Sequence, residues 1–174
     1  MRYLTVFVTT LFLIFTITIS DADAQELVPG ETLPELSSEQ IAERAMVNSL
    51  AFAEALILYA DKQGQTAAEA GRFAGEIFSE GWSDELDPEY FVNGMNRNWQ
   101  MFGVTTKIID ADEGRITARR DRIATEKQFA QAFQVTLSDL ETFFEHVQKG
   151  ITSPHGLTYS ENVEGDYIEF TISK

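Results

Sequence analysis

The sequence predicts a single α+β domain with three helices, a β-hairpin, two further helices and a second hairpin. Three observations support this prediction. Apolar residues recur at helical spacing in the first half of the chain, and the spacing changes to alternation after Gly103. A second alternating stretch ends the chain. Because each hairpin has one apolar face, the simplest arrangement joins them into a four-stranded antiparallel sheet packed against helices.

The amino-terminal residues have the order of features that signal peptidase recognises. One arginine precedes an apolar run at 3–19, and Ala22 and Ala24 occupy the −3 and −1 positions of a cut before Gln25. We therefore expect residues 1–24 to be a signal peptide and the mature protein to be exported, to the periplasm or the extracellular space. No membrane span is then expected to remain. The alternative is an uncleaved anchor, since about 17 apolar residues could just cross a thin bilayer.

The composition argues against several function classes. The chain has 28 acidic and 13 basic residues, a formal net charge of −15, which would repel nucleic acid and anionic membranes. It has no cysteine, which excludes disulfides, thiolate metal sites and thiol nucleophiles. Its two histidines have no zinc-binding spacing. We therefore expect neither a metal nor a cofactor.

The chain after the signal peptide divides into a linker and one domain. Residues 25–36 contain two prolines, a glycine and three glutamates, which is typical of an extended linker. Residues 37–174 are enough for a single core without covalent cross-links. Capping patterns place its first three helices at about 37–62, 66–80 and 87–102.

Two of these helices have unusual faces. The first is apolar on nearly every side over residues 46–60, so we expect it in the middle of the core. The second contains Gly71 and Gly75, and glycine costs about 1 kcal/mol in a helix relative to alanine. Two glycines one turn apart indicate that something approaches this face closely. Close packing of another helix is the commoner explanation, and a bound ligand is the alternative.

The second half predicts both hairpins and the helices between them. The first hairpin covers residues 104–123, and the second covers 157–173 with its turn at Glu164-Gly165. Capping boxes are expected to open the two intervening helices, and Gly150 is expected to end the second of them. The residue pairs that form these boxes are Thr125 with Gln128 and Ser138 with Glu141.

Four arginines are concentrated on the second strand, within residues 115–122. If Ile116 and Ala118 face the core, alternation places Arg120 and Arg122 at its inner rim. There they could bind a carboxylate or a phosphate. The alternative is that the arginines form surface salt bridges on an acidic protein.

Glu54 is a carboxylate within an apolar stretch, and burial there could raise its pKa and suit it to acid–base chemistry. The alternatives are an exposed stripe or pairing with an arginine. An enzyme using Glu54 with Arg120 or His146 is the least favoured function, because no GxSxG elbow or glycine-rich phosphate loop is present. We therefore expect a protein that is not an enzyme.

Aromatic residues are expected to converge between the helices and the sheet. Most of them would form core, and some could line an apolar cavity with arginines at its mouth. The candidate ligand-binding residues are Gly71, Gly75, Trp99, Phe102, Arg120, Arg122, Phe143 and Tyr159.

One family resemblance adds to this prediction. The helix with the sequence GRFAGE (71–76), followed by a hairpin, a helical segment and a terminal hairpin, resembles the 4-vinyl reductase-type small-molecule-binding domains in element order over residues 55–174. The resemblance implies an apolar-ligand pocket between sheet and helices. Those domains usually carry cysteines near their end, and this chain has none.

These observations together predict an exported, non-enzymatic domain that binds an apolar or amphipathic small molecule. The alternative is a structural or protein-interaction module of the cell envelope, which would bind a partner through its sheet edge or its acidic face. A hydrolase-like enzyme is the third hypothesis.

Overall fold

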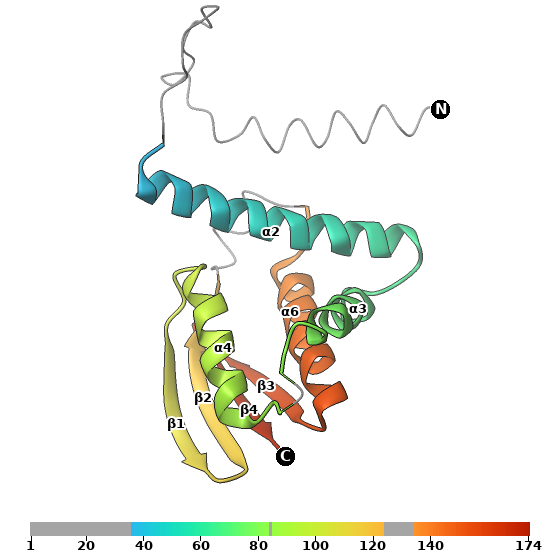
Figure 1. The fold of residues 1–174 in the computed structure, drawn as a ribbon. Helices are drawn as coiled ribbons and strands as arrows, with labels where there is room; N and C mark the ends of the chain where they lie inside the picture. Colours follow the sequence, from blue (N-terminus) through green and yellow to red (C-terminus); the bar gives the residue numbers. More distant parts are fainter. Residues whose placement is uncertain (1–35, 84, 124–133) are drawn as a thin grey trace, which may run out of the picture. The chain divides into compact units, whose positions relative to one another are not determined.

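The computed structural model describes residues 36–83, 85–123 and 134–174 of the chain. Residues 40–174 form one compact unit, which contains these elements apart from the first two residues of α2. The fold is α+β, as the sequence predicts (Figure 1). In chain order the described elements are α2 (Ser38–Lys62), α3 (Ala67–Ser79), α4 (Pro88–Gln100), β1 (Thr106–Asp112), β2 (Arg115–Asp121), α6 (Leu137–Thr152), the 3-10 helix η2 (Ser153–His155), β3 (Thr158–Glu164) and β4 (Tyr167–Ser173).

Several predicted segments lie outside the described residues. They are the signal peptide at 1–24, all but the last residue of the linker at 25–36, and the helix expected to begin at Thr125 and Gln128. Among the described residues, no helix combines the length and the apolar character needed to cross a membrane.

The two hairpins form one four-stranded antiparallel sheet, in the order β1-β2-β4-β3, which confirms the predicted sheet. The second strands of the two hairpins pair directly, with Ala118 opposite Phe170 and Arg120 opposite Ile168. All four of these side chains are buried. Alternation along β2 therefore places Arg120 on the same inward face as its apolar neighbours.

Helices α3 and α6 pack closely, and glycines make the contact possible. A Cβ atom added to Gly71 would lie 2.2 Å from a carbonyl oxygen of α6, and one added to Gly75 would lie 2.3 Å from the oxygen of Val147. Gly150 also belongs to this contact, since a Cβ there would lie 2.8 Å from the Cα of Gly75. The prediction that Gly150 ends the helix is wrong, because α6 continues to Thr152. Helix packing, not termination, requires this glycine.

The start of α6 also differs from the prediction. Its capping box is formed by Thr136 and Asp139, with the Thr136 hydroxyl accepting from the Asp139 N–H at 3.1 Å. The expected pair, Ser138 and Glu141, has the same three-residue spacing and lies within the first turn of the helix. Local pattern does not distinguish the two pairs. In the fold, Glu141 instead accepts from Arg122, the residue directly after β2.

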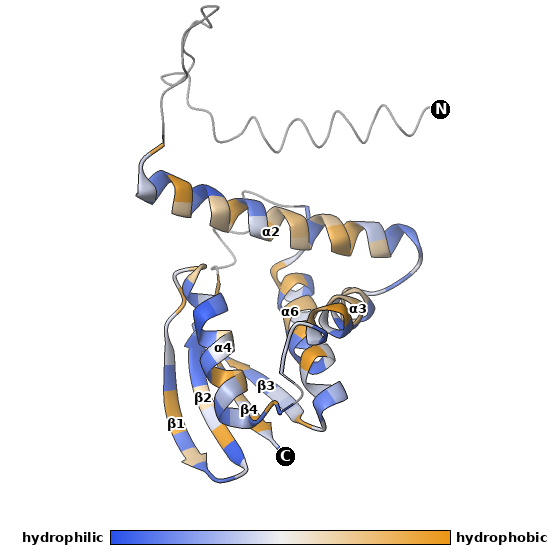
Figure 2. Cartoon of the chain, viewed as in Figure 1, coloured by the Kyte–Doolittle hydropathy of each residue, from blue (hydrophilic) through white to orange (hydrophobic). Residues whose placement is uncertain are grey.

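Helix α2 is buried on one side only, which corrects the expectation of a fully buried helix. Leu50 and Ile57 are buried, whereas the side chains of Phe52 and Tyr59 are 77% and 61% exposed. Figure 2 shows apolar residues along much of α2. The described part of the chain covers only one of its faces, so an all-round apolar sequence leaves large side chains exposed.

Candidate functional site

A buried ion pair lies on the inward face of the sheet. The Nη2 atom of Arg120, on β2, lies 3.3 Å from Oε2 of Glu161, on β3, and the two side chains are 1% and 4% exposed. These strands are not neighbours, because β4 runs between them. Arg120 pairs with Ile168 and Glu161 with Phe170, so the ion pair crosses β4 diagonally. The length of the arginine side chain makes this reach possible.

Tyr159 fixes the carboxylate from the same strand. Its hydroxyl donates to Oε2 of Glu161 at 2.5 Å, so this oxygen accepts from both the tyrosine and the arginine. Burial raises the pKa of Glu161, and the positive charge of Arg120 opposes that rise. Burial also raises the pKa of the Tyr159 hydroxyl well above its usual value, which keeps it a proton donor.

An aromatic ring lies over the guanidinium of Arg120. Its Cζ atom lies 4.2 Å from the ring centroid of Trp99, on α4, which is cation–π geometry. Trp99 in turn contacts Phe102 and Phe144, with ring centroids 5.9 and 5.3 Å apart. The structure therefore connects four of the predicted ligand-binding residues. Arg120 contacts Trp99, which contacts Phe102, and Arg120 and Tyr159 share the carboxylate of Glu161. Phe143 joins the same aromatic group through Phe144, at 5.4 Å.

Sequence reasoning missed Glu161, although a signal for it exists. Tyr159 lies in the first strand of the predicted second hairpin, and alternation along that strand places Glu161 on the same face as Tyr159. A buried carboxylate is costly unless it is paired with a cation, and in this fold Arg120 is that cation.

The other predicted arginine does not join this site. Arg122 donates through Nε and Nη2 to the carboxylate of Glu141 on α6, at 2.6 and 3.0 Å, and through Nη1 to the carbonyl of Gly165. Arg119 points to the other face of β2, where it pairs with Glu169 at 3.0 Å. Arg115 also forms exposed ion pairs, with Asp110 and Asp112. The salt-bridge interpretation therefore holds for Arg115, Arg119 and Arg122, whereas the ion pair of Arg120 is buried.

Glu54 is buried, with 2% of its surface exposed, so it is not on an exposed stripe, and no arginine in the described part of the chain pairs with it. Its Oε1 accepts from the backbone N–H of Gln134 at 2.6 Å, just before α6. Burial raises the pKa of Glu54, and the backbone hydrogen bonds partly offset this. No interaction recorded within the described ranges joins it to Arg120 or to His146. Glu54 thus acts as a link between α2 and the segment that precedes α6.

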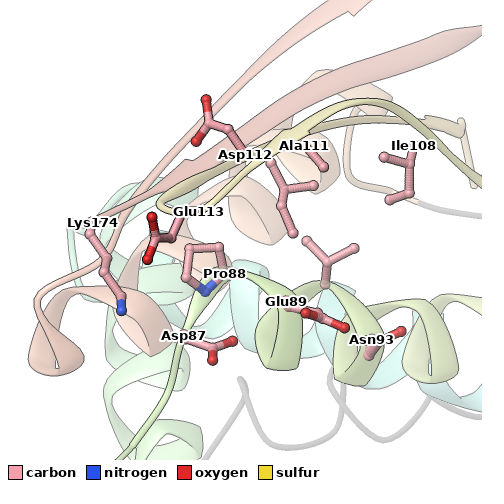
Figure 3. Close-up of a pocket in the computed structure, with 11 residues that line it drawn as sticks. Asp87, Pro88, Glu89, Asn93, Ile108, Ala111, Asp112, Glu113 and Lys174 are labelled. Atoms are coloured by element: carbon pink, nitrogen blue, oxygen red, sulfur yellow. The ribbon is translucent and has the colours of Figure 1, made fainter.

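A pocket of about 520 Å³ lies between α4 and the β1–β2 hairpin (Figure 3). In Figure 3, Pro88, Glu89 and Asn93 on α4 lie across this space from Ile108 and Ala111 on β1. The apolar lining consists of Pro88, Val92, Ile108, Ala111 and Ile116. The polar lining consists of Asp87, Glu89, Asn93, Asp112, Glu113 and Lys174. None of the predicted ligand-binding residues lines it.

The carboxylates of this pocket have different roles. Asp87 caps α4, accepting from the N–H of Tyr90 at 2.8 Å. Asp112 accepts from the N–H of Gly114 in the hairpin turn. Glu89 and Glu113 have no ion pair recorded in the described part of the chain. Glu89 and Glu113 therefore border the apolar floor without an ion pair among the described residues, in a lining that also contains Lys174. In residues 36–83, 85–123 and 134–174, no cluster of three or more histidine or acidic side chains is suited to a metal ion.

Comparisons with known proteins identify no family for the chain. No family model matches it, and no curated protein matches it. One solved structure, described as "Modulating Heme Redox Potential Through Protein-Induced Porphyrin Distortion", is similar with a TM-score of 0.44 and 12% identity, over 86% of this chain and 81% of that chain. A similarity at this level supports no statement about what this chain binds.

Proposed function

We propose that this chain is a non-enzymatic domain that binds an apolar or amphipathic small molecule in the pocket between α4 and the β1–β2 hairpin. The pocket itself carries the proposal. Its volume of about 520 Å³ falls within the range of roughly 300–1,000 Å³ typical of small-molecule sites. Its lining contains no serine, cysteine or histidine, which favours binding over nucleophilic catalysis.

The charges of the pocket indicate the kind of amphipathic molecule. Glu89 and Glu113 border the apolar floor and have no ion pair among residues 36–83, 85–123 and 134–174, and the whole chain carries a net charge of −15. A cation is attracted by such a border, whereas an anion is repelled. The proposed ligand is therefore an apolar chain or ring that ends in an ammonium group. Its apolar part would lie against residues such as Val92 and Ile116.

The position of this pocket suits the resemblance to the 4-vinyl reductase-type domains, which implies a cavity between sheet and helices. Here α4 and the first hairpin form its two walls. The proposal keeps the predicted export of the protein, which places its ligands outside the cytoplasm.

The test compares matched ligands and two neighbouring isoleucines. Octylammonium, octanol and octanoate would be titrated into residues 25–174 by calorimetry. Ile108 and Ile109 are 49% and 46% exposed, but only Ile108 lines the pocket. Ile108→Ser should weaken octylammonium binding about tenfold, and Ile109→Ser should leave it unchanged. Equal effects of the two substitutions, or no binding of octylammonium, would count against the proposal.

The carboxylates provide a second comparison. Glu89→Gln and Glu113→Gln should each weaken octylammonium binding roughly two- to fivefold at low salt, and added salt should reduce the difference. Glu85→Gln is the control, because Glu85 is exposed and does not line the pocket.

A protein-interaction module is the second candidate function, and the exposed apolar side chains favour it. Ile41, Phe52 and Tyr59 on α2, and Phe73, Ile77 and Phe78 on α3, are each more than half exposed. Apolar groups of this size on a surface often mark a binding face. Light scattering would measure the mass of the protein in solution. A dimer that Phe52→Ser or Phe73→Ser dissociates would support this function, and a monomer at all concentrations would oppose self-association.

A further inference from the structure

We propose that a second pocket, on the exposed face of α4, binds a small aromatic carboxylate. This pocket has a volume of about 270 Å³, and it is lined by Gly81 and Trp82, which precede α4, and by five residues of α4 itself. Among the described lining residues, it shares only Asn93 with the pocket between α4 and the β1–β2 hairpin. Its proposed ligand has the opposite charge to the ligand of the first pocket, so either proposal can fail while the other stands.

The spacing of the five α4 residues places them on one side of the helix. They recur at i, i+3, i+4, i+7 and i+8, and residues at these positions are neighbours along one helix face. They are Tyr90, Asn93, Gly94, Arg97 and Asn98. The core residues Phe91, Met95 and Trp99 lie on another side of α4. The pocket therefore lies on the side of α4 that does not face the core.

Gly94 allows the ring of Trp82 to lie against the helix and form one wall of the pocket. A Cβ atom added to Gly94 would lie 2.5 Å from Cη2 of Trp82. The indole ring is also packed edge-to-face with Tyr90, with ring centroids 6.2 Å apart, and lies 5.4 Å from the buried ring of Phe91. These contacts hold Trp82 in place without a ligand. Such pre-organisation raises affinity, because less side-chain entropy is lost on binding.

Arg97 supplies the positive charge of the pocket. It lies exposed in the last turn of α4, where the helix dipole favours a cation. It has no ion pair among residues 36–83, 85–123 and 134–174. None of the lining residues that the structure describes is acidic, although the chain has 28 acidic residues. An arginine without a counter-ion attracts an anion and can bind a carboxylate through two parallel hydrogen bonds.

The rest of the lining selects the class of anion. One arginine matches a single negative charge, and the net charge of −15 disfavours a phosphate dianion. Tyr90 is 55% exposed, so its ring is available to contact a flat apolar ring. The amides of Asn93 and Asn98 can donate further hydrogen bonds to the carboxylate. The volume lies just below the roughly 300–1,000 Å³ of sites for larger ligands, which suits a molecule with a single ring.

The experiment titrates benzoate, benzyl alcohol and cyclohexanecarboxylate into residues 25–174, which contain the whole compact unit 40–174. Benzyl alcohol keeps the flat ring without the charge, and cyclohexanecarboxylate keeps the charge without the flat ring. The chain has two tryptophans, of which only Trp82 lines the pocket. In NMR spectra, benzoate should shift the indole N–H signal of Trp82 and leave that of Trp99 in place. We expect benzoate to bind about threefold or more tighter than either analogue.

Matched substitutions separate the charge from the ring. Arg97→Gln should weaken benzoate binding about fivefold or more and leave benzyl alcohol binding unchanged, because it removes only the charge. Arg44→Gln is the control, since Arg44 is an exposed arginine of α2 that does not line the pocket, and it should leave benzoate binding unchanged. Tyr90→Leu should weaken the binding of benzoate and of benzyl alcohol alike. Circular dichroism would check that each variant is folded.

Two further observations locate the binding. Ile108→Ser, which alters only the first pocket, should leave benzoate binding unchanged. Benzoate that binds no tighter than benzyl alcohol, or equally well to wild type and Arg97→Gln, would overturn the proposal. A shift of the Trp99 signal without a shift of the Trp82 signal would place the binding elsewhere and would also overturn it.

Discussion

Arg120 and Glu161 form an ion pair over a strand to which neither belongs. Their Nη2 and Oε2 atoms lie 3.3 Å apart across β4, and both side chains are almost fully buried. Removing one member of a buried pair leaves an uncompensated charge in the core, whereas replacing both with apolar groups is often neutral or stabilising. The pair is therefore expected to contribute little net stability, although breaking it from one side is costly.

The first prediction tests this energetic pattern. In a Tyr159→Phe background, which avoids an unpaired hydroxyl, Glu161→Leu should destabilise the protein by about 3–5 kcal/mol. Adding Arg120→Met should restore most of that loss. Urea unfolding followed by circular dichroism measures both changes. If adding Arg120→Met leaves the protein as unstable as Glu161→Leu alone, the ion pair itself contributes stability.

The second prediction concerns the contact between α3 and α6. Gly75→Ala should destabilise the protein by about 1–3 kcal/mol, because the new Cβ would lie 2.3 Å from the oxygen of Val147 and neither backbone can move freely. Gly114→Ala is the control, since a Cβ there meets nothing within 4 Å, and its effect should stay within about 0.5 kcal/mol. Thermal unfolding measures both. A neutral Gly75→Ala would mean that the two helices are farther apart than described.

The third prediction is a pH dependence with a defined sign. Burial raises the folded-state pKa of Glu54 above its ordinary value of 4.5, so the folded protein holds this proton more tightly than the unfolded chain. Stability from this group is present below pH 4.5 and is lost as the pH rises through the folded-state pKa. Wild type should therefore lose stability relative to Glu54→Gln across that window, as urea unfolding at several pH values would measure.

Glu69 provides the opposite case as a control. Hydrogen bonds from the backbone and side chain of Thr66 lower the pKa of Glu69 below 4.5. Wild type should therefore lose stability relative to Glu69→Gln as the pH falls through the folded-state pKa of this group. If the stability difference between wild type and variant changed in the same direction with pH for both substitutions, the opposite pKa shifts of Glu54 and Glu69 would be contradicted.

The fourth prediction compares two ion pairs of different exposure. Arg122 binds Glu141 through two nitrogens, with side chains 20% and 16% exposed, and so connects the end of β2 to α6. Glu141→Gln should cost about 1 kcal/mol. Arg115 and Asp110 are 51% and 58% exposed, and Asp110→Asn should have almost no effect. Equal costs in urea unfolding would show that burial does not determine the strength of these pairs.

The fifth prediction concerns export. If residues 1–24 are a signal peptide, the protein released by a secreting host should begin at Gln25, as intact-mass spectrometry would show. Ala24→Leu should block this cleavage, because signal peptidase requires a small residue there. A full-length chain in the membrane fraction of the unsubstituted protein would instead indicate a retained anchor.

Local patterns in the sequence were sufficient for the class of fold and for the inward direction of Arg120. Alternation over a few residues is a local property, and it predicted both hairpins and the face of β2 that carries Arg120. The sequence also predicted the close packing at Gly71 and Gly75, because glycine destabilises a helix and two glycines one turn apart indicate a close contact.

Only the tertiary structure decided which residues meet. Glu161 lies 41 positions from Arg120, and their contact depends on the order β1-β2-β4-β3, which places β4 between them. The pocket likewise depends on how α4 lies against the hairpin, and no motif within either segment indicates that arrangement. Backbone periodicity is fixed by neighbours in the chain, whereas a site is formed by side chains that packing brings together from distant positions.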